Sequence, residues 1–245
     1  MKVAAYQAPL SACASVPEAL QLIREQVERC ESASVEILCC PEGMLGGLAD
    51  YAPEPKAIAI SIEGDRLNAI LAPLKSDTVT TIVGFTETDR GGRLYNTAAV
   101  FYQGSVIGLY RKIHPAIRKS VYTPGNQCPV FTVGALTFGI LICNDSNYPE
   151  LARLMKAQGV AALFIPTNNG LPPAKTDPGI VAAVRKIDVA HAAQNRVSVI
   201  RADVAGQTPD LIAYGSSGII DRDGLVLASA QLMRPDLLVA EIGVS

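Results

Sequence analysis

The chain has 245 residues, of which 49% are hydrophobic and 18% charged, and its formal net charge is −2. This composition is typical of a globular protein, and the length suits one large domain. Lys and Arg are scattered, and the densest basic pairs, Arg111-Lys112 and Arg118-Lys119, are short. The sequence therefore argues against a nucleic-acid partner, which needs a broad basic surface.

The termini and the cysteines bear on the compartment. The opening segment MKVAAYQAPL has too short an apolar stretch for a signal peptide, and no cleavage site follows it. No run of about 18 apolar residues occurs, so we expect no membrane partner. Without a secretory signal, the six cysteines favour a reducing, cytoplasmic location over a disulfide framework.

In the first half of the chain, strands alternate with helices. Residues 2–8 are expected to form a strand. Ser15 and Glu18 have the spacing of a helix N-cap, and apolar residues follow at helical spacing. The further expected elements are a buried strand at 35–40, a helix at 64–75, a strand at 79–85 and a hairpin of strands 96–102 and 105–110.

The second half begins with a long irregular loop at residues 113–130, of the length that usually carries function or is disordered. The elements expected after it are strands at 135–142, 160–165, 197–203, 216–221, 225–229 and 237–242, with helices at 149–158 and 177–196. No repeat or low-complexity linker appears, so residues 1–245 are expected to form a single α/β domain with mixed sheets.

Cys143 is the first candidate for chemistry. It ends the strand-like run ALTFGILI and precedes the helix expected at residue 149. Backbone amides at such a bend favour a thiolate and can donate to an oxyanion. The alternative is a buried, inert cysteine, which is common because free Cys is among the most buried residue types.

Two further reactive groups follow strand ends. Glu42 comes just after the strand at 35–40 and can serve as a general base, or it is a solvated loop acid. Lys112 ends the second hairpin strand and can stabilise negative charge on a substrate oxygen, or it is a surface lysine. Since α/β folds gather their sites at strand ends, Glu42, Lys112 and Cys143 are expected to act together.

The three motifs PEG, RKIHP and CNDSNYPELAR, in this order, resemble those of the nitrilase or carbon–nitrogen hydrolase superfamily. Segments MKVAAYQ, NTAAVF, YTPGN, FIPTNNG, QNRVSVIRAD and YGSSGIIDRDGLVLA are also similar, so the resemblance covers essentially the whole chain. It implies a four-layer α-β-β-α sandwich, no metal or organic cofactor, and a homodimer or higher homo-oligomer that pairs through the helices at 149–158 and 177–196.

The resemblance also implies a reaction, the hydrolysis of a small amide. Glu42 would take the thiol proton of Cys143, whose sulfur would attack the amide carbon to give a thioester. Lys112 and the backbone N–H of Asn144 would stabilise the oxyanion, and water would then release the acid. Asn168 and Asn169, after the strand at 160–165, are expected at the pocket, and Tyr148 either shapes the pocket or packs under the next helix.

The chain departs from the family in one loop. Many members carry a second Glu before the Thr-Pro-Gly segment, where this chain has Arg118 and Lys119. The basic pair either attracts an anionic substrate or forms a solvated loop face. This departure motivates one alternative, a catalytically degenerate member that acts as a binding or assembly module.

The nucleophile motif bears on the substrate. Nitrilases of this superfamily typically have Cys-Trp-Glu, whereas this chain has Cys-Asn-Asp and contains no Trp. Amide hydrolysis is therefore favoured over the second alternative, hydrolysis of a nitrile. The two histidines, His114 and His191, are expected to make structural hydrogen bonds, and with no acidic cluster beside them no metal site is expected.

Overall fold

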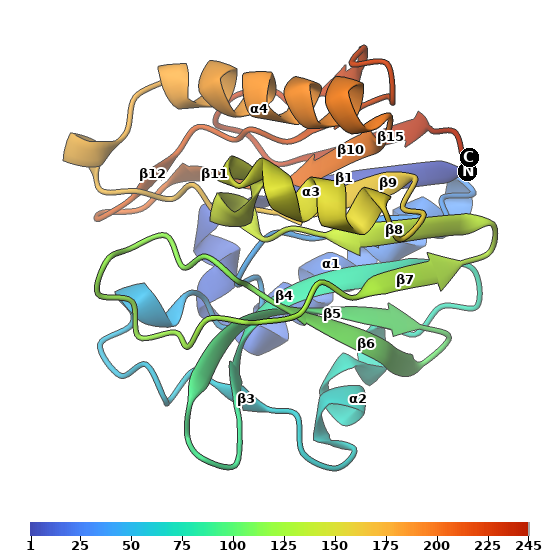
Figure 1. Ribbon diagram of the computed structural model, residues 1–245. Coiled ribbons are helices and arrows are strands. Elements are labelled where there is room, and N and C mark those ends of the chain that lie inside the picture. The colour runs from blue at the N-terminus through green and yellow to red at the C-terminus, as the bar shows by residue number, and fades with distance from the viewer. Residues whose placement is uncertain (245) are drawn as a thin grey trace.

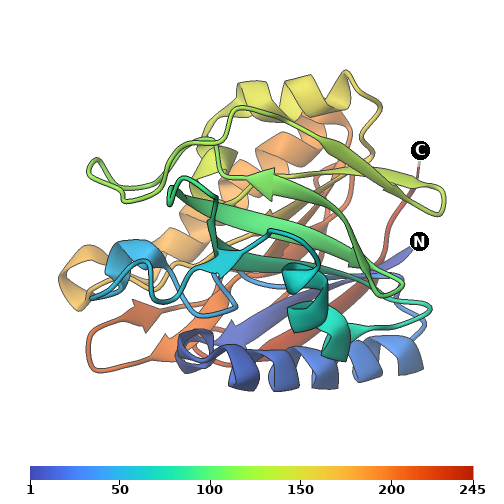
Figure 2. The ribbon, with the colours of Figure 1, turned by 90° about the horizontal axis from the view of Figure 1, so that it is seen from below.

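The computed structural model describes residues 1–244, in which two β-sheets stack face to face between two pairs of helices (Figure 1). In the view of Figure 2, α1 (Val16–Ser32) and α2 (Arg66–Leu71) lie on one outer side, and α3 (Pro149–Lys156) and α4 (Gly179–Asn195) on the other. The expected four-layer α-β-β-α sandwich is confirmed. Within residues 1–244, no helix is both long and apolar enough to cross a membrane.

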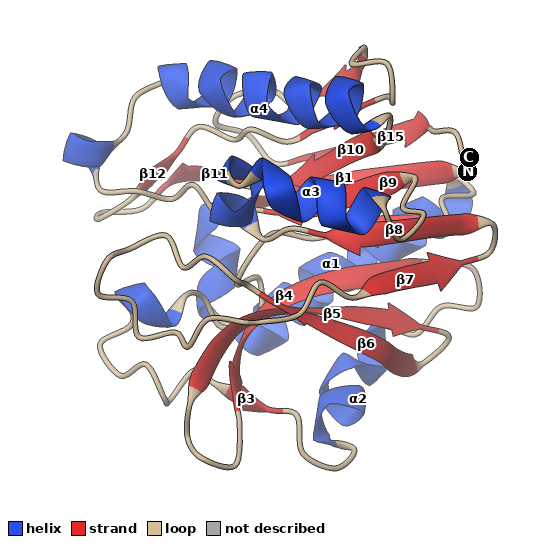
Figure 3. Ribbon diagram, viewed as in Figure 1, coloured by secondary structure: helices blue, strands red, loops and turns tan. Residues whose placement is uncertain are grey.

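The first sheet has nine strands in the order β12-β11-β1-β2-β4-β5-β6, with β15 paired to β1 and β3 to β4. Strands β1, β2 and β4 are parallel to one another, and β5 and β6 continue the sheet antiparallel (Figure 3). The strands are β1 (Lys2–Pro9), β2 (Ile37–Cys39), β3 (Ile60–Ser61), β4 (Thr80–Thr88), β5 (Leu94–Tyr102), β6 (Ser105–Arg111), β11 (Val204–Gln207), β12 (Ile212–Ala213) and β15 (Asp236–Glu241).

The second sheet has six strands in the order β14-β13-β10-β9-β8-β7, and its central strands β8, β9 and β10 are parallel. They are β7 (Val130–Val133), β8 (Leu136–Ile140), β9 (Ala162–Pro166), β10 (Ser198–Ala202), β13 (Gly218–Ile220) and β14 (Val226–Ser229). Strand β6 runs in the same direction as β2 and β4, because β5 between β4 and β6 is antiparallel to both neighbours. The carboxyl ends of strands with one direction lie at one edge of a sheet, so the first sheet gathers the segments that follow β2 and β6, and the second those that follow β8 and β9.

The alternation of side chains along β1 places them in two cores. Val3 and Ala5 pack between the sheets, whereas Ala4 and Tyr6 pack on the other face together with Ile23 of α1. The neighbouring strand β2 is buried on both faces in the same way. This double burial explains why residues 2–8 and 35–40 are near-continuous apolar runs.

Local signals explain several element boundaries. Ser15 caps α1 by accepting a hydrogen bond from the Glu18 N–H at 3.5 Å, as the sequence predicts. The helix expected at 64–75 is shorter, because Pro73 cannot continue the α-helical hydrogen bonding and a 3₁₀ turn (Ala72–Leu74) follows. The strand expected at 197–203 is β10, which pairs in the second sheet, and after Asp203 the chain crosses to the first sheet as β11, a strand that the sequence did not predict.

Candidate active site

The three candidate residues line one cavity of about 350 Å³. Glu42 follows β2, Lys112 directly follows β6, and Cys143 begins the 3₁₀ turn η4 (Cys143–Asn147) after β8. Asn168 and Asn169, which follow β9, line the same cavity. The edges of the two sheets thus bring together residues that are more than 100 positions apart in sequence.

The carboxylate of Glu42 is oriented by three donors. The Lys112 Nζ donates to its Oε1 at 2.6 Å, and Asn96 Nδ2 donates to the same oxygen at 2.8 Å. The backbone N–H of Asn168 donates to Oε2 at 3.0 Å. Glu42 and Lys112 are both buried, so their attraction is little screened by water.

The charge on Lys112 follows from its neighbours. Burial alone would lower the pKa of Lys112, but the Glu42 carboxylate outweighs burial and holds the pKa above its usual value. Lys112 is therefore an ammonium that lines the cavity beside the sulfur. Such a fixed cation is suited to stabilise an oxyanion that forms there.

The surroundings of Cys143 favour the neutral thiol over the thiolate. Burial and the nearby Glu42 carboxylate raise its pKa to about 12, although Lys112 offsets part of this shift. Its Sγ lies 3.9 Å from Asn169 Oδ1, close enough to donate a weak hydrogen bond. With so small a thiolate fraction at neutral pH, attack by this sulfur requires a base that removes the proton during the reaction.

Asp145 fixes the turn that presents the sulfur. Cys143 has a φ of +46°, in the left-handed region that non-glycine residues seldom adopt. The fully buried Asp145 carboxylate accepts hydrogen bonds from the backbone N–H of Ile142 at 3.2 Å and of His114 at 2.8 Å, and from Tyr110 Oη at 2.8 Å. It thereby ties the nucleophile turn to the segment that carries Lys112.

Asp203 has a similar role for Asn169. The backbone N–H and the Nδ2 of Asn169 both donate to the Asp203 carboxylate at 3.0 Å, which leaves Oδ1 facing the sulfur. The Ser216 Oγ also donates to this carboxylate at 2.6 Å. Because Asp203 stands where the chain crosses between the sheets, the crossover itself positions Asn169.

The other expected pocket residues differ in placement. Asn144 lines the cavity, and within the described residues its backbone N–H, in the first turn of η4, has no hydrogen-bond acceptor. Tyr148 is not part of the cavity wall, because its ring stacks on His114 at 3.5 Å between centroids. The packing alternative for Tyr148 is therefore the one that the geometry supports.

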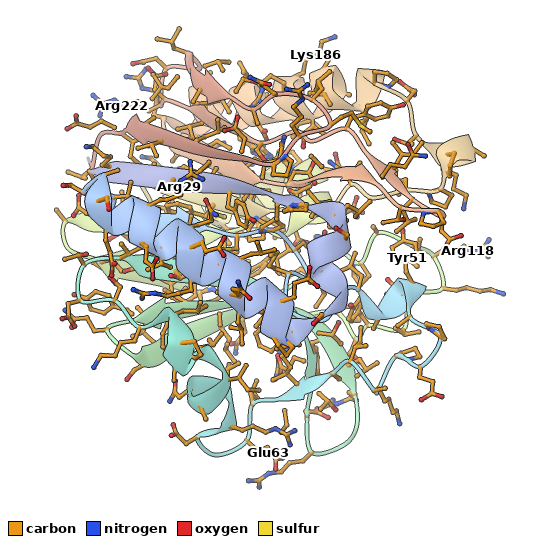
Figure 4. All side chains as sticks on the ribbon, turned by 180° about the vertical axis from the view of Figure 1, so that it is seen from behind. Arg29, Tyr51, Glu63, Arg118, Lys186 and Arg222 are labelled. Carbon is orange, nitrogen blue, oxygen red and sulfur yellow. The ribbon has the colours of Figure 1, made fainter. Side chains whose placement is uncertain are left out.

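Both histidines make structural contacts. The ring of His114 lies 3.2 Å from Asp145 Oδ1, and His191 Nε2 lies 2.7 Å from the Ser146 carbonyl oxygen. Arg118 and Lys119 are exposed and lie outside the cavity lining. Figure 4 shows Arg118 extending from the edge of the molecule into solvent. This placement agrees with a solvated loop face rather than with a basic pair that attracts an anionic substrate.

Sequence reasoning missed two buried polar groups of the site. Arg201, on β10, lines the cavity, and its Nε donates to Asp188 Oδ2 at 2.8 Å and its Nη1 to Thr167 Oγ1 at 2.7 Å. Asn96, on β5, orients Glu42. The sequence did contain a signal for Arg201, which is a charged residue inside the apolar strand VSVIRA. Burying an unpaired charge would destabilise the fold, so such a residue indicates a buried partner.

Several reactive protein groups lie together in this cavity. Within residues 1–244, no cluster of three or more His, Cys, Asp or Glu side chains is arranged to hold a metal ion. The cavity lining includes a thiol, a carboxylate oriented by hydrogen bonds and an ammonium, and it also includes Asn144, whose backbone N–H is unpaired among the described residues. These four groups suit nucleophilic attack on a polarised carbon followed by stabilisation of an oxyanion.

Comparisons with known proteins agree with this architecture. The family model described as carbon-nitrogen hydrolase matches residues 2–245. A nitrilase from Pyrococcus abyssi is 32% identical over 76% of this chain and 68% of its own length. An (R)-stereoselective amidase from Pseudomonas is 28% identical over 81% of this chain and 70% of its own length. The solved carbon–nitrogen hydrolase from Helicobacter pylori has a TM-score of 0.86 at 23% identity, over 100% of this chain and 89% of that one. The chain belongs to the carbon–nitrogen hydrolase family.

Proposed function

We propose that the chain hydrolyses the C–N bond of a small amide, with Cys143 as nucleophile, Glu42 as general base and Lys112 as oxyanion stabiliser. The observation that carries this proposal is the buried Glu42–Lys112 pair, 2.6 Å apart, in the same cavity as Cys143. The family membership and the amidase relative support it. Asn144, Asn168 and Asn169 are proposed to contact the substrate.

The first half-reaction forms a thioester. Glu42 accepts the Cys143 proton as the sulfur attacks the amide carbon, because a thiol with a pKa of about 12 does not ionise beforehand. Lys112 and the Asn144 N–H stabilise the oxygen of the tetrahedral intermediate. Glu42 then returns the proton to the nitrogen, and the C–N bond breaks to release ammonia or an amine.

The second half-reaction regenerates the thiol. Water enters the cavity, Glu42 accepts one of its protons, and the resulting hydroxide attacks the thioester carbonyl. The tetrahedral intermediate collapses with cleavage of the C–S bond, and the proton held by Glu42 restores the Cys143 thiol. The balance is amide plus water to carboxylic acid plus ammonia or amine.

Ammonia release from a panel of primary amides tests the proposal. We expect Cys143→Ala to abolish release, and Cys128→Ala, which removes the other partly exposed thiol, to retain the parent rate. Hydrolysis by Cys143→Ala at the parent rate would overturn the mechanism. No turnover of amides, carbamoyl compounds or nitriles, together with an unreactive Cys143, would instead indicate a catalytically degenerate binding or assembly module.

A second candidate is the hydrolysis of a small nitrile. The observation that favours it is the similarity to the Pyrococcus abyssi protein, which is named a nitrilase. Nitriles and amides both yield an acid and ammonia, so the substrate itself must be varied. Paired measurements with an amide and the nitrile of the same carbon skeleton decide between them. The amidase proposal predicts a higher kcat/KM for the amide, and the reverse order would favour the nitrile.

We also propose that the protein is a homodimer or a higher homo-oligomer that pairs through α3 and α4. Leu154 of α3 is 55% exposed, which supports an apolar contact on that outer layer. Light scattering of the parent and of Leu154→Lys tests this proposal. A monomeric parent would overturn it, and dissociation by the lysine would support pairing through α3.

A further inference from the structure

One wall of the cavity comes from the N-terminal half of α4. Ile180, Ala183, Val184 and Ile187 follow the i, i+3, i+4, i+7 spacing of one helix face, and all four line the cavity. None of them is fully buried. Figures 1 and 2 show the beginning of α4 on the same side of the molecule as the long loop after β6.

That loop and its neighbours add further apolar surface. Ile117 of the loop is 39% exposed and lines the cavity together with Leu48 and Leu171. Apolar side chains from α4 and from these loops thus form part of the cavity wall. Exposed apolar walls around a few convergent polar groups are typical of a ligand site.

The two cations that line the cavity are already paired with carboxylates. Lys112 is paired with Glu42, and Arg201 with Asp188. The remaining carboxylate, Asp50, accepts hydrogen bonds from Ser120 Oγ at 2.9 Å and from the Val121 N–H at 2.8 Å. Among the described residues that line the cavity, no cation is left over to neutralise an anionic substrate.

We propose that this apolar wall, defined by Ile180, Ala183, Val184 and Ile187, binds the acyl chain of the substrate, and that the substrates are primary amides of short, uncharged aliphatic acids. This inference rests on the proposed amidase function and specifies its substrate class. The volume of about 350 Å³ is near the lower end of the range for ligand sites, and it readily holds a short acyl chain.

A series of chain lengths measures the apolar wall directly. Each methylene removed from water contributes about 0.8 kcal/mol, which corresponds to about fourfold in kcat/KM. We expect kcat/KM to rise about fourfold per carbon from acetamide to butyramide, whereas succinamate and 4-aminobutyramide, with charged chains of similar length, are poor substrates. A flat series, or a preference for either charged amide, would overturn the inference.

Substitutions on α4 locate the effect. Val184→Lys is expected to lower kcat/KM for butyramide at least tenfold and to reduce the discrimination against succinamate. The matched control is Ala182→Lys, on an exposed position of the same helix that does not line the cavity, and it should leave both values unchanged. The milder Val184→Ala, which keeps the helix intact, should lower kcat/KM for butyramide more than for acetamide. Equal losses for both amides would contradict the inference.

A binding readout separates this inference from the amidase proposal. Butyramide should protect Cys143 from alkylation by iodoacetamide, and succinamate at the same concentration should not. Protection in this order without any turnover would leave the apolar subsite standing and overturn only the amidase function. Turnover of amides without protection of Cys143 by butyramide would leave the amidase function standing and overturn the apolar subsite. Neither turnover nor protection would overturn both proposals.

Discussion

The Nζ of Lys112 lies 2.6 Å from Oε1 of Glu42, and neither side chain is more than 4% exposed. A buried ion pair adds little net stability, because the desolvation of both charges offsets their attraction. Removing one partner is costly, however, because it leaves a buried charge uncompensated. The pair is therefore better explained by the chemistry of the cavity than by the stability of the fold.

Lys112→Met is predicted to destabilise the protein by about 3–5 kcal/mol, because the Glu42 carboxylate then lacks its cation. Activity should be lost at the same time. The double variant Lys112→Met/Glu42→Gln removes both charges, so it should regain part of the stability but none of the activity. Urea unfolding and ammonia release measure the two effects. A double variant no more stable than Lys112→Met would contradict the electrostatic account.

Asp145→Asn is predicted to lower kcat and to destabilise the fold by about 1–3 kcal/mol. The carboxylate of Asp145 accepts hydrogen bonds from three donors, whereas the NH2 group of an asparagine cannot accept any. The substitution therefore leaves at least one buried donor without an acceptor. Asp210→Asn, at an exposed turn, serves as the control and should stay within about 0.5 kcal/mol of the parent. An unchanged kcat in Asp145→Asn would show that the turn does not depend on this carboxylate.

The double variant Arg118→Ala/Lys119→Ala is predicted to keep kcat/KM for neutral amides within about twofold of the parent. Both side chains are exposed and outside the cavity lining, and isolated surface substitutions seldom change stability by more than about 0.5 kcal/mol. Steady-state kinetics check this prediction. A large loss would indicate that the loop moves its basic pair over the cavity.

Stability is predicted to fall at alkaline pH. Burial raises the pKa of Cys13 and of Cys30 to about 12 each, whereas an unfolded cysteine titrates near about 8.5. Between these values the unfolded chain binds fewer protons than the folded one, so each thiol removes about 1.4 kcal/mol of stability per pH unit. The stability that these protonated thiols contribute is fully present below about pH 8.5 and is lost as the pH rises towards 12. Urea unfolding of Cys30→Ala should show a correspondingly shallower slope, and an unchanged slope would contradict the assignment.

The sequence predicted the positions of the reactive groups well, because each follows a strand with a clear apolar pattern. The runs before Glu42, Lys112 and Cys143 are β2, β6 and β8, and the capping pair Ser15 and Glu18 marks the start of α1. Helix α4, expected at 177–196, spans Gly179–Asn195. Strong local signals therefore predicted these elements and their ends to within a few residues, whereas the short strands β3, β7, β11 and β12 were not predicted.

The contacts that organise the site were not predictable in this way. Asp203 stands where the chain passes from β10 in one sheet to β11 in the other, and no local pattern in the sequence indicates that a second strand begins directly after it. The partners of Asp145 and Arg201 come from distant segments, and pairing of that kind depends on how the sheets stack. The sequence did not decide whether Tyr148 lines the pocket or packs under the next helix. The direction of its ring depends on the loop that carries His114, on which the ring stacks.

The acyl-enzyme itself provides the most direct test of the central claim, that Cys143 is the nucleophile. Intact-mass and peptide analysis of the protein, quenched in acid during turnover of butyramide, should show an acyl group on the peptide that contains Cys143. The group should be absent from Cys143→Ala, which should release no ammonia. An acyl group on another residue, or continued hydrolysis by Cys143→Ala, would contradict the account.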